Sequence, residues 1–416
     1  MQDTAFPERV TDSGKKRPAP MVGPVSRSRL PAAVAIAYAC MALFGLILLL
    51  IGSLLPTLPH LTNRQAGDLG SCPLLGILLS TVFTGPLLER FGARPVLAAG
   101  LILVAAPLAA MPLASGFGPW AAAALAYGLG GGVLNTASNA LVAMLQPERR
   151  GAALNRLGAF FSLGAVCAPL LMSFLLTLNG AHAVALGLWL LALLTIGLLV
   201  WLLRANLPAG TYTAPGREQV SALRHPLVWG LGLILFFESG NENALFVWGA
   251  RLADRLTGTG PAAAEWVLVG LTATLGLGRW LVSYSLRPRW ARPVIVVSAA
   301  LVVAGLAIAW RLADPGNLAG FACGMGMAGF GLAAIYPTVL GVAGDRFAQS
   351  TGTVFSAIMT LGLLGGVLAP RLAGWLAASG SRNVLLAPLA GAIMVGLLGA
   401  ILARPQARAA PTGTGN

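Results

Sequence analysis

The segment LGLILFFESGNENALFVWGARL, residues 231–252, is long and apolar enough to cross a lipid bilayer, yet it carries two acids near its middle. Glu238 and Glu242 are four residues apart, so they lie on one face of a helix. An acid at membrane depth is costly unless it faces a cavity or a partner. Asn241 lies close to that face, and Trp248 lies further along the segment. We therefore expect a functional site on this helix.

The composition predicts that most of the chain has no contact with water. Of the 416 residues, 57% are hydrophobic and 10% are charged, whereas a soluble domain carries about a quarter charged residues. The net charge of +14 does not indicate nucleic-acid binding, because the basic residues lie in short runs between apolar segments. The four cysteines and three histidines lack the spacing of a metal site or a disulfide framework, so we expect no metal and no cofactor.

Twelve apolar stretches are each long enough to span the hydrocarbon of a membrane. They cover residues 31–58, 69–89, 94–114, 119–145, 152–178, 183–203, 227–252, 262–286, 291–312, 317–344, 351–378 and 382–403. The chain is therefore predicted to be an all-α membrane protein with twelve transmembrane helices. The polar, basic residues 1–30 are predicted to form a disordered tail, and residues 404–416 a second tail.

The distribution of Arg and Lys predicts how the chain is oriented. With the N-terminus inside, most of the 27 basic residues fall in inner segments. The outer loops are expected to hold five: Arg64, Arg251, Arg255, Arg311 and Arg382. This bias places both termini and both tails in the cytoplasm. An odd number of helices would destroy the bias, which supports twelve.

The chain also repeats itself at a shift of 201 residues. The shift superposes four glycines and a proline of the first half on the same residue types in the second: Gly128, Gly130, Gly151, Gly164 and Pro169 on Gly329, Gly331, Gly352, Gly365 and Pro370. The repeat predicts two six-helix bundles, residues 31–203 and 227–403, joined by a cytoplasmic linker at 204–226. Two such parallel copies are typical of a transporter whose site lies near the midplane.

The sequence GPLLERFGARPVL, residues 85–97, resembles the cytoplasmic loop between the second and third helices of the major facilitator superfamily. Gly85, Glu89, Arg90, Gly92 and Arg94 match that family's pattern, with Glu in place of the commoner Asp. The resemblance assigns these residues to gating, as a charge cluster at helix ends that locks one face of the transporter. The alternative is that the two arginines are ordinary positive-inside anchors.

Within that superfamily the chain looks most like the fucose permease type, the fucose:proton symporters. YGLGGGVLNTASNALV (127–142) resembles the fourth helix of that type, LGLGRWL (275–281) its eighth, and the segments 329–346 and 351–376 its tenth and eleventh. One departure matters. The first span holds no acid, and Asn135 occupies the position of the fourth-helix glutamate, so that family's proton route does not carry over.

Proton coupling is instead assigned to Glu238 or Glu242, with Arg279 as the partner. Glu238 lies about 11 residues and Arg279 about 8 residues from the cytoplasmic ends of their helices, which gives similar depths and permits a salt bridge. An acid whose partner leaves during alternating access would take up and release a proton. The alternative is a static ion pair that holds the seventh and eighth helices together.

A substrate site is expected from polar and aromatic groups on three helices. Asn135 and Asn139 share a face of the fourth helix, Asn241 and Trp248 come from the seventh, and Tyr336 comes from the tenth. Amides and aromatic rings suit a polyol or sugar, because they combine paired donors and acceptors with an apolar platform. Alternatively, the asparagines bond between helices, and Tyr336 with its following proline only marks a helix break.

These features predict a secondary active transporter, a proton-coupled symporter of a small polar solute such as a sugar, working by alternating access. The alternative is an efflux carrier for lipophilic or drug-like compounds, which the scarcity of acids in the first half favours. An enzyme is not expected, because no nucleotide-binding loop, metal cluster or nucleophile triad is recognisable. The expected partners are the solute, H⁺ and the lipid of a bacterial inner membrane, in which the chain would lie as a multi-pass monomer that binds no nucleic acid.

Overall fold

The computed structural model describes residues 30–146, 150–205, 207, 217–285, 290–347 and 350–402. Both expected tails and much of the expected linker lie outside these ranges. The described part of the linker includes one short helix, η4 (Arg217–Arg224).

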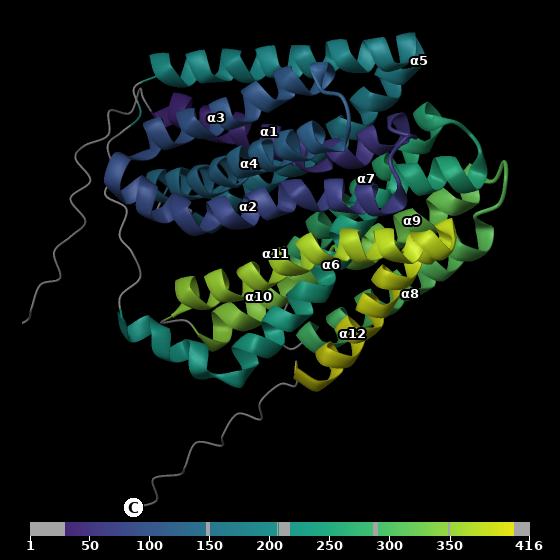
Figure 1. The fold of residues 1–416 in the computed structure, drawn as a ribbon. Coiled ribbons are helices and arrows are strands. Elements are labelled where there is room, and N and C mark those ends of the chain that lie inside the picture. Colours follow the sequence, from purple (N-terminus) through teal and green to yellow (C-terminus); the bar gives the residue numbers. More distant parts are fainter. Residues whose placement is uncertain are drawn as a thin grey trace, which may run out of the picture.

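The described chain is built from α-helices joined by short turns (Figure 1). The first half holds α1 (Leu30–Leu54), η1 (Leu55–Thr57), α2 (Asn63–Phe91), α3 (Ala93–Ala110), η2 (Met111–Leu113), α4 (Phe117–Leu145) and α5 (Arg150–Arg204). The second half holds α6 (Pro226–Thr257), α7 (Pro261–Ser285), α8 (Ala291–Leu312), α9 (Leu318–Leu332), α10 (Ile335–Arg346), α11 (Thr351–Leu376), η6 (Ala377–Ser379), η7 (Ser381–Leu385) and α12 (Leu386–Leu402).

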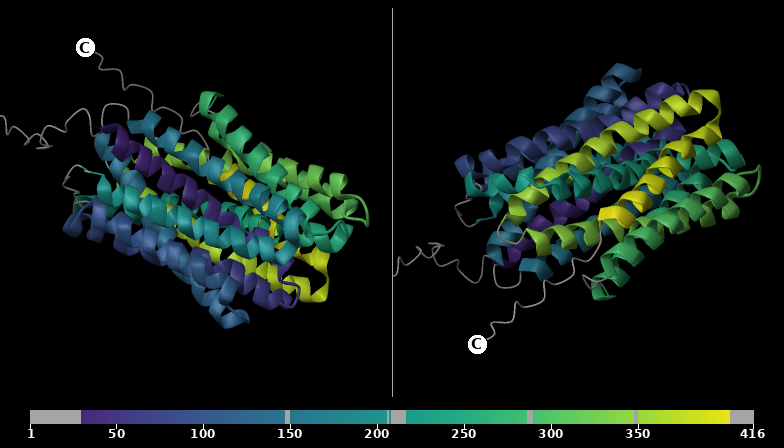
Figure 2. Two further views of the ribbon diagram at one scale, coloured as in Figure 1. Left: turned by 90° about the horizontal axis from the view of Figure 1, so that it is seen from above. Right: turned by 90° about the horizontal axis from the view of Figure 1, so that it is seen from below.

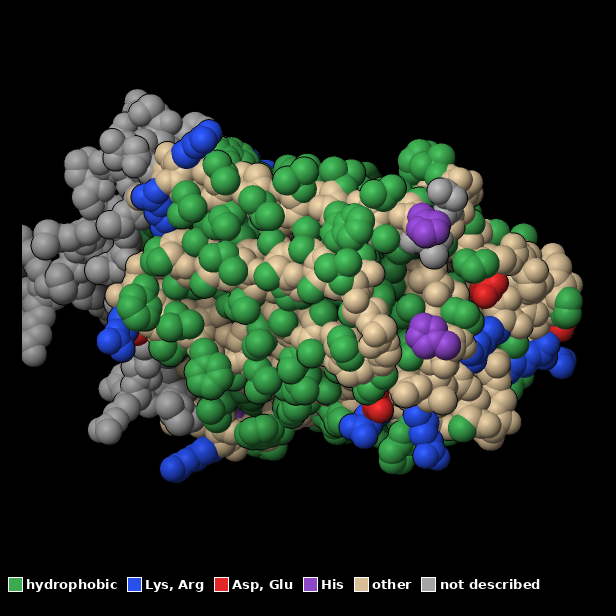
Figure 3. All heavy atoms as spheres, turned by 45° about the horizontal axis from the view of Figure 1, so that its top comes forward, with side chains coloured by type: hydrophobic (Ala, Val, Ile, Leu, Met, Phe, Trp, Pro, Cys, Tyr) green, Lys and Arg blue, Asp and Glu red, His purple; other side chains and the backbone are tan. Residues whose placement is uncertain are grey.

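The expected all-helical membrane fold is confirmed. Eleven helical segments of the described residues are long and apolar enough to cross a membrane. The 32-residue α6 is also of membrane length, but it is not among these eleven, and it carries the acids and amides of the central segment. Figure 3 shows a broad band of hydrophobic side chains on one face, with most of the visible Arg side chains toward its two ends. The orientation of the termini stays a prediction.

Three of the expected spans have different boundaries in the structure. The stretches 152–178 and 183–203 are arms of one helix, α5, which bends at Gly180; the φ of +54° at this residue lies in the left-handed region that glycine adopts freely. The stretch 317–344 is divided into α9 and α10. Pro337 lies one turn beyond this break and lacks the N–H that would continue the helical hydrogen bonds. The helix thus breaks just before Tyr336 and Pro337, and the substrate role of Tyr336 stays a prediction.

Glycines of the repeat make equivalent close contacts in the two halves. A Cβ atom on Gly164 of α5 would lie 1.8 Å from the carbonyl oxygen of Ala42 in α1. A Cβ atom on Gly365 of α11 would lie 1.8 Å from the carbonyl oxygen of Phe236 in α6. The same residue thus brings the same pair of helices into contact in each copy, as expected for a duplicated six-helix unit.

The two halves lie side by side, with their helices running along a common long axis (Figure 2). They meet where α2 packs against α11, α5 against α7, and α1 against α6. Polar contacts across this boundary gather near the start of α2. Asn63 donates to the carbonyl oxygen of Ala377 at 3.0 Å, and Arg371 of α11 forms a 3.0 Å ion pair with Asp68 of α2.

Arg251 adds the most enclosed of these contacts. The expected place of Arg251 in an outer loop is wrong, because it lies within α6 and is only 2% exposed. Its guanidinium donates to the carbonyl oxygens of Leu55, Leu58 and Leu61 at 3.3, 3.4 and 2.7 Å. These carbonyls belong to the chain just after α1, so a cation from the second half binds the end of the first helix of the first half. This end of the molecule, which carries the α1–α2 and α6–α7 connections, is closed.

We expect Gly365→Ala to destabilise the protein by about 1–3 kcal/mol, because the added methyl group would force α6 and α11 apart. Gly270→Ala is the matched control, since that helical glycine has open space where the methyl group would go. Its effect should be neutral or stabilising by up to about 1 kcal/mol. The measurement is the melting temperature of the detergent-solubilised protein, and equal melting temperatures for the two variants would contradict the close contact.

Candidate functional site

The site is built on α6, whose ends are set by local sequence signals. The helix begins at Pro226, which suits a first helical position, and the Nδ1 atom of His225 accepts a hydrogen bond from the N–H of Leu227 at 3.1 Å. It ends at Gly258, which adopts a left-handed φ of +64°. Glu242 therefore lies close to the middle of a 32-residue helix.

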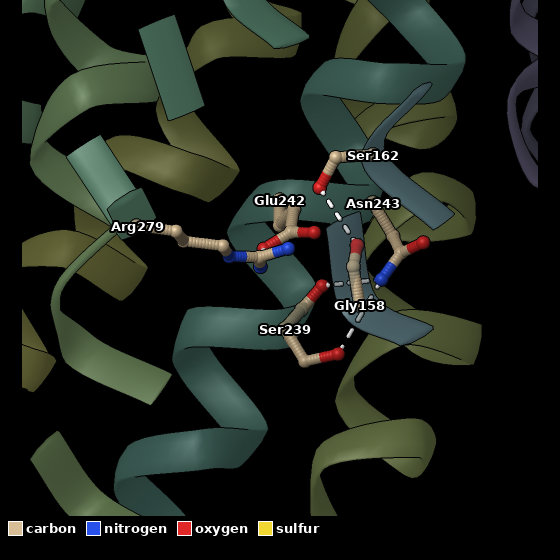
Figure 4. Close-up of polar contacts among 6 residues, drawn as sticks. All are labelled: Gly158, Ser162, Ser239, Glu242, Asn243 and Arg279. Atoms are coloured by element: carbon tan, nitrogen blue, oxygen red, sulfur yellow. Dashed lines mark hydrogen bonds and ion pairs between the residues drawn. The ribbon is translucent and has the colours of Figure 1, made fainter. Parts of the chain in front are cut away.

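Glu242 forms an ion pair with Arg279 of α7. The Nη2 atom of Arg279 lies 2.7 Å from the Oε2 atom of Glu242 (Figure 4). The side chains are 28% and 11% exposed, respectively, so the pair is neither sealed nor freely solvated. A charge-assisted hydrogen bond of this length is strong, and separating its partners in a poorly solvated place is costly.

Glu238 and Tyr336 complete a cluster around the pair. Glu238 lies one helical turn before Glu242 and interacts with it and with Arg279. Tyr336 of α10 lies in the same electrostatic environment. One oxygen of the buried Glu238 side chain has no hydrogen-bond partner among the described residues. The cluster therefore holds two carboxyl groups for one guanidinium and has the capacity to bind a proton.

Two polar side chains near the cluster, Ser162 and Ser239, are not among the site residues predicted from the sequence. Ser162 of α5 lies beside α7, 4.0 Å from where a Cβ atom on Gly276 would be, and its hydroxyl donates to the carbonyl oxygen of Gly158 (Figure 4). Ser239 of α6 packs with Asn243, which donates to its carbonyl oxygen at 2.8 Å. A serine inside an apolar stretch gives little signal in a sequence, because it so often bonds only to its own helix.

The two predicted asparagines of α4 are bonded to each other. Asn139 donates to the side-chain oxygen of Asn135 at 2.9 Å and to its backbone oxygen at 2.8 Å. Both side chains are half-buried. This pairing within α4 leaves the remaining polar atoms of the two amides available, and their substrate role stays a prediction.

Asn241 does not lie with the carboxylates. Its side chain packs against Gly391 of α12, where an added Cβ atom would lie 2.2 Å from the Asn241 oxygen. This contact forms part of a groove of about 870 Å³ between α6, α11 and α12, lined mainly by apolar residues such as Phe236, Leu368, Trp375 and Met394. Asn241 is next to Glu242 in the sequence but faces a different side of α6.

Trp248 also makes its contacts away from the cluster. It is 2% exposed, and its Nε1 atom donates to the carbonyl oxygen of Pro370 in α11 at 3.0 Å. The indole ring fits against Gly374 of the same helix. This contact joins α6 to α11 within the second half.

The residues of the predicted gate lie at the opposite end of the molecule from Arg251. Glu89, Arg90 and Arg94 are exposed, and Gly92 connects α2 to α3 with a φ of +79°. Arg94 donates to the carbonyl oxygen of Leu203 in α5, and the Arg90 guanidinium lies 5.2 Å from the Phe91 ring. A Cβ atom on Gly85 would meet open space. These contacts stay within the first half, so the gating role is still a prediction.

The two repeats differ in chemistry at the position of the cluster. The contact of Ala42 with Gly164 corresponds to that of Phe236 with Gly365, which relates α1 to α6 by an offset of 194 residues. At this offset Phe44 and Leu48 are the counterparts of Glu238 and Glu242. At these positions the acids therefore belong to one copy alone, although both copies share the same helix packing.

The family model of the Major Facilitator Superfamily matches residues 32–370. The chain belongs to the Major Facilitator Superfamily. It is a multi-pass membrane transporter and not an enzyme.

Curated relatives of this major facilitator transporter are distant. The inner membrane transport protein YdiN of Escherichia coli is 24% identical over 322 residues, which cover 75% of this chain and 74% of YdiN. The multidrug resistance protein MdtH of Cronobacter sakazakii is 29% identical over 238 residues, which cover 54% of this chain and 58% of MdtH.

Solved structures share the fold. A bacterial homologue of the human lysosomal transporter Spinster, in an inward-facing and unoccupied conformation, superposes with a TM-score of 0.77 at 14% identity, over 91% of this chain and 98% of that one. The E. coli fucose:proton symporter FucP superposes with a TM-score of 0.62 at 18% identity, over 91% of this chain and 100% of FucP. Likeness at these identities establishes the fold, and the closer relation to the fucose permease type stays a prediction.

We expect Arg279→Met to destabilise this transporter by about 1–3 kcal/mol, because Glu242 would be left without its partner. In the double variant Glu242→Gln with Arg279→Met, the loss should be smaller than the sum of the two single losses. Melting temperatures of the wild type and the three variants complete the cycle. Strictly additive losses would show that the two side chains do not interact.

Proposed function

We propose that this chain is a proton-coupled secondary transporter of a small polar solute, such as a sugar, in a bacterial inner membrane. The observation that carries the proposal is the 2.7 Å ion pair between Glu242 and Arg279, with a second carboxyl group beside it. Charged groups in a membrane helix are expensive and are retained where they move ions or solutes. In this proposal Glu242 takes up a proton when Arg279 leaves it, and Glu238 is the neighbouring site through which the proton passes.

The residues around the pair support a polar solute. Arg279 and Tyr336 supply hydrogen-bond donors, the carboxyl groups supply acceptors, and Ser162 offers a hydroxyl from the other half. A sugar or polyol would satisfy such a set and would compete with Glu242 for Arg279. Membership of the fucose permease type is part of this proposal, and the shared fold of FucP is compatible with it.

A second candidate is efflux of lipophilic compounds. The groove between α6, α11 and α12 favours it, because its volume of about 870 Å³ and its apolar lining suit a drug-sized molecule. The relation to MdtH, a multidrug resistance protein, points the same way. In that case Asn241 would contact the transported compound from the floor of the groove.

The contacts between the halves support alternating access. Arg251, Asn63 and the Arg371–Asp68 pair close one end of the molecule, whereas the predicted gate at the other end makes its described contacts within one half. With the predicted orientation of the termini, the closed end is the outer one. Opening it requires that Arg251 leave the three carbonyl oxygens after α1.

The first experiment identifies the substrate class. Thermal-shift measurements on the purified protein, with sugars, organic acids and cationic drugs as separate panels, should give a stabilised melting temperature with a polar solute. Stabilisation by the drug panel alone would support the efflux candidate.

Glu242→Gln is then expected to abolish accumulation of the substrate in proteoliposomes under an imposed pH gradient, while exchange of labelled for unlabelled substrate continues. Neutral Gln cannot carry a proton but can still accept a hydrogen bond from Arg279 or the substrate. The measurement is radiolabelled uptake with and without the gradient. Accumulation that survives in both Glu238→Gln and Glu242→Gln would contradict the proposed coupling site.

A further inference from the structure

Glu265 of α7 is a buried acid that the expected coupling site does not include. Its side chain is 0% exposed, and neither carboxylate oxygen has a hydrogen-bond partner among the described residues. The described residues form ion pairs between Arg279 and Glu242, between Arg371 and Asp68, and between Arg382 and Asp314. None of these pairs includes Glu265. Like Glu238, Glu265 is an acid within a predicted span, so the sequence gives the same signal for both residues.

The group that faces Glu265 comes from the other half of the molecule. Ser53 of α1 is the side chain that interacts with it, and the Ser53 hydroxyl is itself fully buried without a well-formed hydrogen bond. Ser173 of α5 donates to the carbonyl oxygen of Ala262, one turn before Glu265, at 2.8 Å. Ser53 also lies two residues before Leu55, whose carbonyl binds Arg251. Glu265 is therefore enclosed by the closure of the halves.

Within the part of the chain that the structure describes, no ion pair compensates the charge of Glu265. The helices packed near it, namely α1, α5, α6 and α9, carry the titratable side chains Tyr38, Cys40, Arg156, Cys167, His182, Arg204, Glu238, Glu242, Arg251, Asp254, Arg255 and Cys323. Among the described residues, none of these forms an ion pair with Glu265, and the side chain that faces it is Ser53. Glu265 lies just beyond the first turn of α7, where the helix dipole favours a negative charge only weakly. Enclosure without a counter-ion disfavours the charged form more strongly.

From this geometry we propose that Glu265 is a proton-binding site of the outer closure, distinct from the Glu238–Glu242 cluster. The proton comes from water on the outer side and binds the carboxylate as α1 and α7 come together. It returns to the same side when the halves separate and water reaches the carboxyl group again. This inference rests on the alternating access proposed above, but the proton at Glu265 does not cross the membrane.

The direction of the pH effect depends on which of the two states, closed or open, binds the proton more tightly. The closed arrangement holds Glu265 in its neutral form, while the open arrangement exposes it to water, where the carboxylate is well solvated. A proton therefore binds the closed state more tightly and shifts the population toward it. Lower pH on the outer side should close this end of the transporter.

The test measures closure directly and needs no substrate. Cysteines replace the exposed residues Ser115 and Pro315, one in each half, on a full-length background in which the four native cysteines are serine. The spin-labelled protein is placed in phosphatidylcholine nanodiscs, and the distance between labels is measured by double electron–electron resonance from pH 5 to pH 9. The short-distance fraction should rise as the pH falls. In Glu265→Gln it should stay high and lose most of its pH dependence.

Three comparisons make the outcome decisive. Asp345→Asn, which neutralises an exposed acid at the far end of α10, should keep the wild-type response. Glu238→Gln with Glu242→Gln should also keep it, and adding Glu265→Gln should remove it. If Glu265→Gln lowers the yield of monodisperse protein, Glu265→Asp replaces it and should shift the midpoint of the response.

A wild-type response in Glu265→Gln would overturn the proposal, and so would its loss in the Glu238→Gln, Glu242→Gln variant. Because the readout is a distance in the absence of solute, it is independent of the accumulation assay. Failure of Glu242 as a coupling group would leave this response intact, and failure of Glu265 would leave the accumulation result intact.

Discussion

The interaction on which the rest of this transporter depends is the pairing of acid and base inside helices that otherwise face hydrocarbon. An ionised side chain at membrane depth is tolerated when an opposite charge or a polar cavity compensates it. Arg279 supplies that compensation to Glu242 across 2.7 Å, and Glu238 lies within reach of the same guanidinium. Two acids and one base leave the balance of charge dependent on a bound proton. In the proposed mechanism, a solute or a movement of α7 relative to α6 changes the protonation of the site.

Duplication explains why the scaffold can support such a site. Gly164 and Gly365 bring equivalent helices into backbone contact in the two halves, so the packing does not depend on the chemistry of the midplane residues. The first copy has Phe44 and Leu48 where the second has Glu238 and Glu242. One half thus presents mainly an apolar surface, while the other half carries the ionisable groups. In the proposed alternating access, opening of the closed end would break the Arg371–Asp68 ion pair between the halves, whereas the Glu242–Arg279 pair lies within the second half.

The closed end is held by a different kind of interaction from the ion pair between Glu242 and Arg279. Arg251 binds three backbone carbonyl oxygens that follow α1, which makes the contact strong in this arrangement and dependent on the backbone course of both halves. Ser53 and Glu265 lie beside it, enclosed and without charge compensation. In the proposal made here, the contact of Arg251 closes this end, and protonation of Glu265 removes the cost of enclosing an unpaired carboxylate. The proposed closure is reversible, because the acid would regain its hydration when the halves separate.

Much of this could be predicted from the sequence, because the decisive signals are local. Runs of apolar residues as long as a bilayer is thick predict spans, and the shift of 201 residues predicts two copies, whatever the helices contact. The similar distances of Glu238 and Arg279 from their helix ends predicted that Arg279 meets an acid of α6, but they did not choose between Glu238 and Glu242. The structure pairs Arg279 with Glu242. Two span boundaries differ from those expected, because α5 continues through a bend at Gly180 and a break one turn before Pro337 separates α9 from α10.

The tertiary structure decided which way each side chain faces and what it meets. Asn241 lies one residue from Glu242, but room beside Gly391 turns it toward α12. Arg251 reads as a loop residue in the sequence and is instead buried against carbonyls nearly 200 positions away. The enclosure of Glu265 depends on its packing next to Ser53, which lies on a helix of the other half. Spans follow from hydropathy along the chain, whereas pairing of side chains follows from packing between helices, which hydropathy does not encode.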